Sequence, residues 1–130
     1  MKQYSKPPQP SFAGNQIKES DLVFTAENEK DTLTLSTQNL LYIESSDNYS
    51  TIVFLKDQQI VKELIRSSLT RLEGQIQAKT IVRCHRSFIV NLDKVMKVSG
   101  NAQGFKLQLS ETDFIVPVAR KYSEIVYQFR

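Results

Sequence analysis

The residues best suited to chemistry stand side by side in the segment IVRCHRSFIVNL, residues 81–92. Cys84 and His85 could form a thiol–imidazole dyad, but neighbouring side chains of an extended segment point to opposite faces. The chain has one cysteine and one histidine, too few ligands for a standard zinc site. Its four glycines form no phosphate-binding loop. We therefore expect no catalysis, no metal and no other cofactor. Cys84 is interpreted as a small core residue, with a redox-sensing role as the alternative.

Arg86 conflicts with the pattern of the same segment. If residues 81–92 form a strand, one face is apolar and comprises Val82, Cys84, Phe88, Val90 and Leu92. Arg86 has the same parity, and an unpaired guanidinium in a core is very costly. We therefore predict a break at residues 85–87 that turns Arg86 outward and leaves Cys84 and Phe88 buried. The alternative is a buried salt bridge of Arg86. Arg83 suits that role better, with a carboxylate such as Glu44 as its partner.

Positive charge is concentrated in the last third of the chain. Residues 1–82 hold nine Lys and Arg against ten Asp and Glu, whereas residues 83–130 hold eight against four. This asymmetry favours an anionic partner, although a solvated basic face would give the same count.

The first 20 residues differ in composition from the rest. They carry three of the four prolines and lack periodicity, so we interpret 1–20 as a flexible linker or N-terminal arm and 21–130 as one folded domain. No apolar run approaches the roughly 18 residues of a membrane span, and no signal peptide is recognisable. A single cysteine excludes an internal disulfide and agrees with a reducing compartment. We expect a cytoplasmic protein without membrane contact.

Short strands dominate the predicted domain. Their ranges are 22–25, 32–35, 40–45, 50–55, 59–64, 105–109 and 114–118, the last an edge strand because it contains Pro117. An apolar stripe of Ile65, Leu69, Leu72 and Ile76 predicts a central helix that Ser67 or Ser68 can cap. A second stripe of Tyr122, Ile125, Val126 and Phe129 predicts a short C-terminal helix. The fold class is mainly β with two small helices.

Three motifs together resemble the LytTR DNA-binding domain. IVRCHRSFIVNL resembles the family's Arg-x-His-Arg-Ser signature, LLYIESSDNYSTI its strand and Asn-Tyr loop, and IVPVARKY its Pro-Val-Ser-Arg element. Ala119 stands where the last element usually has Ser. The order and spacing of all three agree, and the resemblance covers roughly residues 21–130.

The resemblance implies an elongated β-rich domain in which loops enter successive major grooves of double-stranded DNA. Such domains usually serve as output domains of bacterial response regulators in two-component systems, behind a receiver or sensor domain. Nothing before Asp21 is long enough for a receiver, so the chain is either a fragment of a longer regulator or a stand-alone domain. Paired direct-repeat sites and a homodimer on DNA are further implications.

The resemblance also assigns candidate contacts. Tyr49, Arg86 and Arg120 correspond to base-reading positions, and arginine is well shaped for two hydrogen bonds to guanine. Candidates for phosphate contact or positioning are Asn48, Ser50, His85, Ser87, Lys121 and Ser123. Tyr49 could instead pack against the sheet, Arg120 could be merely solvated, and His85 could brace the loop through a backbone hydrogen bond.

A second function is compatible with the same fold. The chain could be a protein-interaction domain that has lost DNA binding, and the departure at Ala119 would weaken a contact if the usual Ser braces the loop or binds a phosphate. The retained Arg86, Arg120 and Lys121 favour DNA.

Overall fold

The computed structural model describes residues 21–129, so the arm predicted for residues 1–20 lies outside the described residues. A central antiparallel sheet has the strand order β5-β4-β3-β7-β6. Its strands are β3 (Leu40–Ser46), β4 (Tyr49–Lys56), β5 (Gln59–Ile65), β6 (Ile81–His85) and β7 (Phe88–Asn91).

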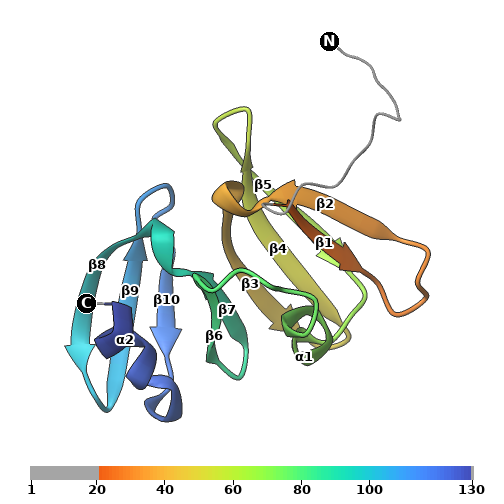
Figure 1. Ribbon diagram of the computed structural model, residues 1–130. Coiled ribbons are helices and arrows are strands. Elements are labelled where there is room, and N and C mark those ends of the chain that lie inside the picture. The colour runs from red at the N-terminus through yellow and green to blue at the C-terminus, as the bar shows by residue number, and fades with distance from the viewer. Residues whose placement is uncertain (1–20, 130) are drawn as a thin grey trace.

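Smaller β elements lie on either side of the central sheet (Figure 1). A hairpin consists of β1 (Asp21–Thr25) and β2 (Thr32–Ser36), and a three-stranded sheet consists of β8 (Val95–Asn101), β9 (Gly104–Leu109) and β10 (Ile115–Val118). The helices are α1 (Leu69–Glu73) and α2 (Glu124–Phe129), with 3-10 turns η1 (Thr37–Asn39), η2 (Leu92–Lys94) and η3 (Arg120–Tyr122). Among the described residues, none of the helices is long and apolar enough to cross a membrane.

The central sheet packs against a separate core on each face, but the face of β5 that carries Ile60, Lys62 and Leu64 is exposed. Ile43, Ile52 and Ile89 pack with the β1–β2 hairpin and α1. Tyr42 and Val90 point the other way and pack with β9, β10 and α2. Because side chains alternate along a strand, one sheet serves both cores and is held from both sides.

The predicted mainly-β fold is confirmed, and every predicted strand is present within one residue or so at each end. Pro117 lies in β10, which is an edge of its sheet, as predicted. β8 was missed. Its pairing with β9 shifts register between Val95 and Lys97, and this irregularity interrupts the alternation that marks a strand.

The central helix is shorter than its apolar stripe predicted. Ile65 ends β5 opposite Ser50, and the helix comprises only Leu69–Glu73, with the hydroxyl of Ser68 accepting from the Arg71 amide as its cap. Ile76 packs on the same core beyond the helix. The stripe identified buried positions, but these come from a strand, a helix and a loop. At the C-terminus the predicted helix is divided, because Tyr122 belongs to η3 and α2 begins at Glu124.

Candidate nucleic-acid interface

Three chain reversals converge at one edge of the molecule, the lower edge in Figure 1. These are the β3–β4 turn, the β6–β7 turn and η3. The Ser45 amide donates to the Ser87 carbonyl at 2.9 Å and joins the first two. The Ala119 amide donates to the Cys84 carbonyl, also at 2.9 Å, and joins η3 to the β6–β7 turn. Elements distant in sequence therefore present their tips side by side.

The β6–β7 turn confirms the prediction made from parity. β6 ends at His85, β7 begins at Phe88, and Arg86 between them is exposed. Cys84 and Phe88 are buried, at 0% and 8% exposure. The break predicted in the strand is a hairpin reversal, which lets one apolar face continue on both sides of an outward-pointing arginine.

Arg83 is ion-paired as predicted, but the partner proposed for it was wrong. Its Nη1 lies 3.0 Å from Oε1 of Glu73 in α1. Glu44 lies on β3, and β7 separates that strand from β6. The same guanidinium donates through Nε to the His85 carbonyl at 2.8 Å and through Nη2 to the Arg86 carbonyl at 2.7 Å.

His85 adopts the bracing role that was one of its two alternatives. Its Nδ1 accepts a hydrogen bond from the Ser87 amide at 3.1 Å. This bond requires the neutral tautomer with the proton on Nε2. Ser87 is half-buried within the turn. His85 therefore shapes the loop next to Arg86.

The β3–β4 turn presents Asn48 and Tyr49 at the same edge. Asp47 adopts a φ of 52°, a left-handed conformation that Asp tolerates better than most residues. Asn48 is exposed, and Tyr49 is 42% exposed although it is already part of β4. Ser50 differs from expectation: its side chain is completely buried, and its hydroxyl donates to the Ser67 carbonyl at 2.8 Å. We therefore drop Ser50 from the candidate phosphate contacts.

The third reversal carries two exposed cations. Arg120 and Lys121 are exposed in η3, and Lys121 Nζ lies 5.1 Å from the ring centroid of Tyr122. Ala119 is the N-cap of this turn and forms no side-chain cap hydrogen bond. Ser123, which follows η3, is half-buried.

Arg66 is a candidate that sequence reasoning missed. It directly follows β5, is exposed, and its Cζ lies 5.9 Å from the ring centroid of Tyr49. The pairing of Ser50 with Ile65 brings it to the edge formed by the three reversals. The sequence lacks a signal for this proximity, because only the strand register places Arg66 beside Tyr49.

The cysteine and the histidine do not form a dyad. Cys84 Sγ donates to the Phe88 carbonyl at 3.7 Å inside the core, whereas His85 is engaged with the turn backbone. Burial raises the pKa of the Cys84 thiol to about 12, against a smaller lowering effect of Arg83. Within residues 21–129 no group of three or more His, Cys, Asp and Glu side chains could hold a metal ion.

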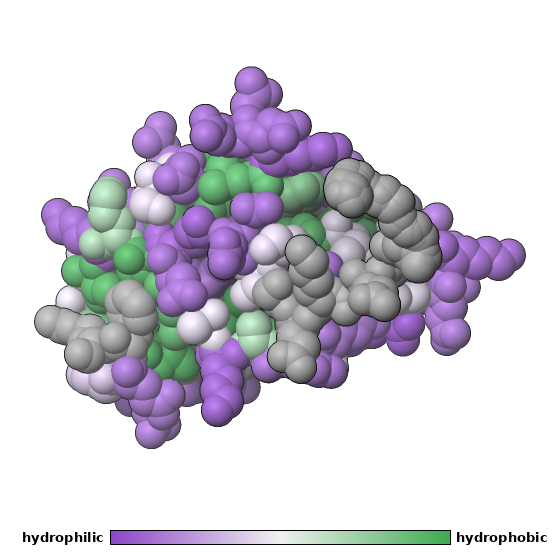
Figure 2. Space-filling model, turned by 45° about the horizontal axis from the view of Figure 1, so that its top comes forward, coloured by the Kyte–Doolittle hydropathy of each residue, from purple (hydrophilic) through white to green (hydrophobic). Residues whose placement is uncertain are grey.

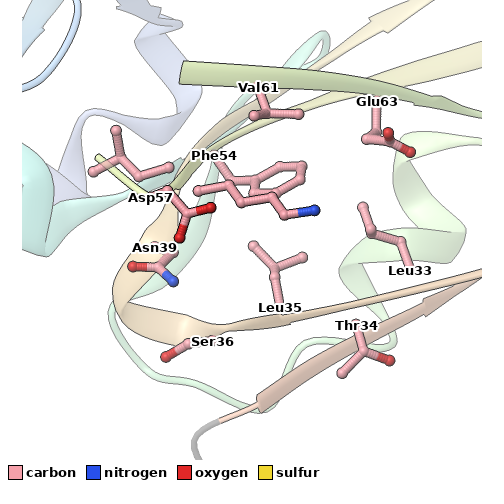
Figure 3. Close-up of a pocket in the computed structure, with 11 residues that line it drawn as sticks. Leu33, Thr34, Leu35, Ser36, Asn39, Phe54, Asp57, Val61 and Glu63 are labelled. Atoms are coloured by element: carbon pink, nitrogen blue, oxygen red, sulfur yellow. The ribbon is translucent and has the colours of Figure 1, made fainter. Parts of the chain in front are cut away.

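One concave part of the surface lies away from the three reversals. A pocket of about 360 Å³ runs between β2 and β5, where Leu35, Phe54 and Val61 point toward one another and Asp57 lies at the rim (Figure 3). Apolar patches interrupted by hydrophilic residues are visible in Figure 2, in which the top of Figure 1 is turned forward.

Comparison with known proteins agrees with the fold. Residues 30–129 match the family model of the LytTr DNA-binding domain. The chain belongs to the LytTR family. A LytTr DNA-binding domain from Bacillus cereus has the same fold, with a TM-score of 0.65 at 21% identity over 83% of this chain and 95% of that one.

Two curated relatives of this chain carry the names of regulators. The transcriptional regulatory protein YpdB of Escherichia coli K12 is 26% identical over 109 residues, which are 83% of this chain and 43% of YpdB. An uncharacterized response regulatory protein of Vibrio cholerae is 29% identical over 86 residues, which are 66% of this chain and 33% of that protein. The chain thus spans less than half the length of these relatives.

Proposed function

We propose that this domain binds double-stranded DNA sequence-specifically and acts as the output domain of a bacterial transcriptional regulator in the cytoplasm. Loops from the three reversals enter major grooves, and Tyr49, Arg86 and Arg120 contact bases. The observation that carries the proposal is the convergence of these three exposed side chains on one edge, joined by the hydrogen bonds at Ser87 and Ala119. Two arginines held by rigid backbone suit two-bond recognition of guanine.

Phosphate contacts would come from residues beside the reading positions. Lys121 and Arg66 are exposed cations at this edge, and Asn48 offers an exposed amide. Ser87 and Ser123 are half-buried in or beside the same loops, and each offers a hydroxyl, because their amides already donate to His85 Nδ1 and to the Arg120 carbonyl. Contacts of this kind fix the register of a protein on a duplex and make binding salt-dependent.

The names of two relatives, a transcriptional regulatory protein and a response regulatory protein, support a regulatory context. We propose that a receiver or sensor domain precedes this domain in the working regulator. We also propose that the domain binds as a pair on direct-repeat sites.

A protein-interaction role is the second candidate. Ile60 and Met96 are 44% and 61% exposed and line one hollow together with Leu109. Ile60 lies on β5 and pairs with Leu55, near the end of β4 that is farther from Tyr49. The rest of the hollow is polar or acidic and includes Glu111 and Asp113. Exposed apolar side chains remote from the basic edge suit a protein partner that does not compete with DNA.

Selection from random duplex DNA tests the proposal directly. The domain is incubated with a randomised duplex library, bound molecules are sequenced over several rounds, and the enriched sequence is titrated against a scrambled duplex. We expect one enriched motif and clearly tighter binding of it. Absence of enrichment, with no affinity for any duplex at low salt, would reject DNA binding and favour the protein-interaction role.

A further inference from the structure

The β6–β7 turn is held by donors from three directions. The carbonyl oxygens of Cys84, His85, Arg86 and Ser87 accept hydrogen bonds in succession. The Ala119 amide satisfies the first and the Ser45 amide the last, while the two middle carbonyls both accept from Arg83. The carbonyl oxygens of the turn are thereby occupied by donors of the protein itself, and the side chain of Arg86 is exposed.

Arg83 uses four of its five N–H donors for these and neighbouring contacts. Nε and Nη2 hold the two turn carbonyls, and Nη1 contacts Glu73 at 3.0 Å and Thr70 at 3.5 Å. Glu73 and Thr70 both belong to α1. The planar guanidinium therefore links the turn that carries Arg86 to a helix of the core.

We propose that Arg83 is a positioning residue for sequence recognition: it fixes the turn that presents Arg86 to DNA without touching DNA itself. The proposal rests on the proposed function, because it assigns a role in reading bases. Base recognition by two parallel hydrogen bonds requires placement within about half an ångström, so a loosened turn would lose discrimination first.

The same geometry argues against Arg83 as a phosphate contact. Its side chain is only 14% exposed, and the carboxylate of Glu73 neutralises its charge. A residue that neutralises no phosphate releases no counterion, so its loss leaves the salt dependence of binding unchanged.

The chain offers a matched control in Arg71. This arginine also donates to two backbone carbonyls, those of Thr25 at 3.4 Å and Ala26 at 3.2 Å. These carbonyls lie at the β1–β2 hairpin, away from the β6–β7 turn. Arg71→Gln therefore removes a comparable set of side-chain to backbone hydrogen bonds. A general loss of stability would lower DNA affinity in Arg71→Gln and Arg83→Gln alike.

The test compares Arg83→Gln, Arg83→Lys and Arg71→Gln with the unaltered domain. Each is titrated with the selected duplex and a scrambled duplex at several salt concentrations. For Arg83→Gln we expect about tenfold weaker binding of the selected duplex, less than about a twofold change on the scrambled one, and an unchanged salt slope. Arg71→Gln should preserve the ratio of the affinities for the selected and the scrambled duplex. Arg83→Lys should also lose discrimination, because an ammonium keeps the charge but not the fork that spans two carbonyls.

A second readout needs no DNA and separates this inference from the proposed function. Amide proton and nitrogen chemical shifts of Arg86 and Ser87, and the exchange rate of the Ser87 amide, report the turn directly. We expect both to change in Arg83→Gln and Arg83→Lys and to stay constant in Arg71→Gln. If Arg83→Gln does not fold, Arg83→Lys decides.

Two results would overturn the role of Arg83. One is a folded Arg83 variant that keeps the ratio of affinities for the two duplexes and shows unchanged chemical shifts and amide exchange at Arg86 and Ser87. The other is a salt slope lower by about one unit, which would make Arg83 a phosphate contact. Failure of the unaltered domain to prefer any duplex would instead reject the proposed function, and the amide measurements would still report whether Arg83 holds the turn.

Discussion

The amide of Ala119 donates to the carbonyl oxygen of Cys84 at 2.9 Å. Arg120 follows the donor directly, and Arg86 lies two residues beyond the acceptor. This backbone hydrogen bond therefore ties together the two segments that carry the arginines proposed to read bases. It also joins β10, at the edge of the three-stranded sheet, to β6, at the edge of the central sheet.

Restoring a hydroxyl at Ala119 should stabilise the third reversal. Ala119 is the N-cap of η3 and lacks a side-chain acceptor. In Ala119→Ser the hydroxyl can accept from a free amide of the first turn, which adds about 0.5 to 1 kcal/mol to the free energy of unfolding. Urea denaturation measures the gain, and Ala102→Ser, in the exposed β8–β9 turn, is the matched control. Equal stability of the two variants would show that η3 cannot use the cap.

Removing the buried hydroxyl of Ser50 should affect stability and not DNA binding. Ser50→Ala leaves the Ser67 carbonyl without its donor at a completely buried site, which should cost about 1 to 3 kcal/mol. Denaturation in urea measures that loss. Titrations of the folded variant with the selected and the scrambled duplex should give the affinities of the unaltered domain. An equal loss of affinity on both duplexes would instead return Ser50 to the phosphate contacts.

Alkaline pH should destabilise the domain partly through Cys84. Burial raises the pKa of this thiol from 9.0 to about 12 in the folded state. Between these values the unfolded chain loses a proton that the folded chain keeps, so the free energy of unfolding falls as pH rises, by at most about 1.4 kcal/mol per unit from this group.

Stability curves from pH 8 to 12 (roughly the window set by the two pKa values) are compared for the unaltered domain and Cys84→Ala. Burial also raises the pKa of Tyr42, which adds a slope of the same sign to both proteins. The difference between the curves isolates the thiol. We expect a shallower fall in Cys84→Ala, and superimposable slopes would disprove burial of the thiol.

Arg66→Ala should weaken binding to any duplex about equally. Arg66 is an exposed cation beside Tyr49 at the reading edge, and its loss should lower the dependence of log K on log salt by about one unit. Lys62→Ala removes an exposed cation from the middle of β5 and serves as the control. Similar slopes for both variants would place Arg66 outside the DNA contact.

Strand positions and the outward turn of Arg86 were predictable, because alternation and the cost of a buried charge act locally. The partner of Arg83 was not. Glu73 and Arg83 are brought together by the packing of α1 against the sheet, and their separation in the sequence does not indicate this contact. Burial of Ser50 was equally hidden: a serine in a strand next to a loop resembles a surface residue until its neighbour Ser67 is known. The bulge in β8 removed the one signal on which its prediction would have depended.

The central claim is that Arg86 and Arg120 read bases while Lys121 holds phosphate. The most direct measurement titrates Arg86→Ala, Arg120→Ala and Lys121→Ala with the selected and the scrambled duplex, at salt concentrations from about 50 to 200 mM. We predict that each arginine variant loses about 1 to 3 kcal/mol on the selected duplex and much less on the scrambled one. Lys121→Ala should lose affinity about equally on both, with a salt slope lower by about one unit. Equal losses on the two duplexes for Arg86→Ala and Arg120→Ala would contradict the account, because the arginines would then only neutralise phosphates.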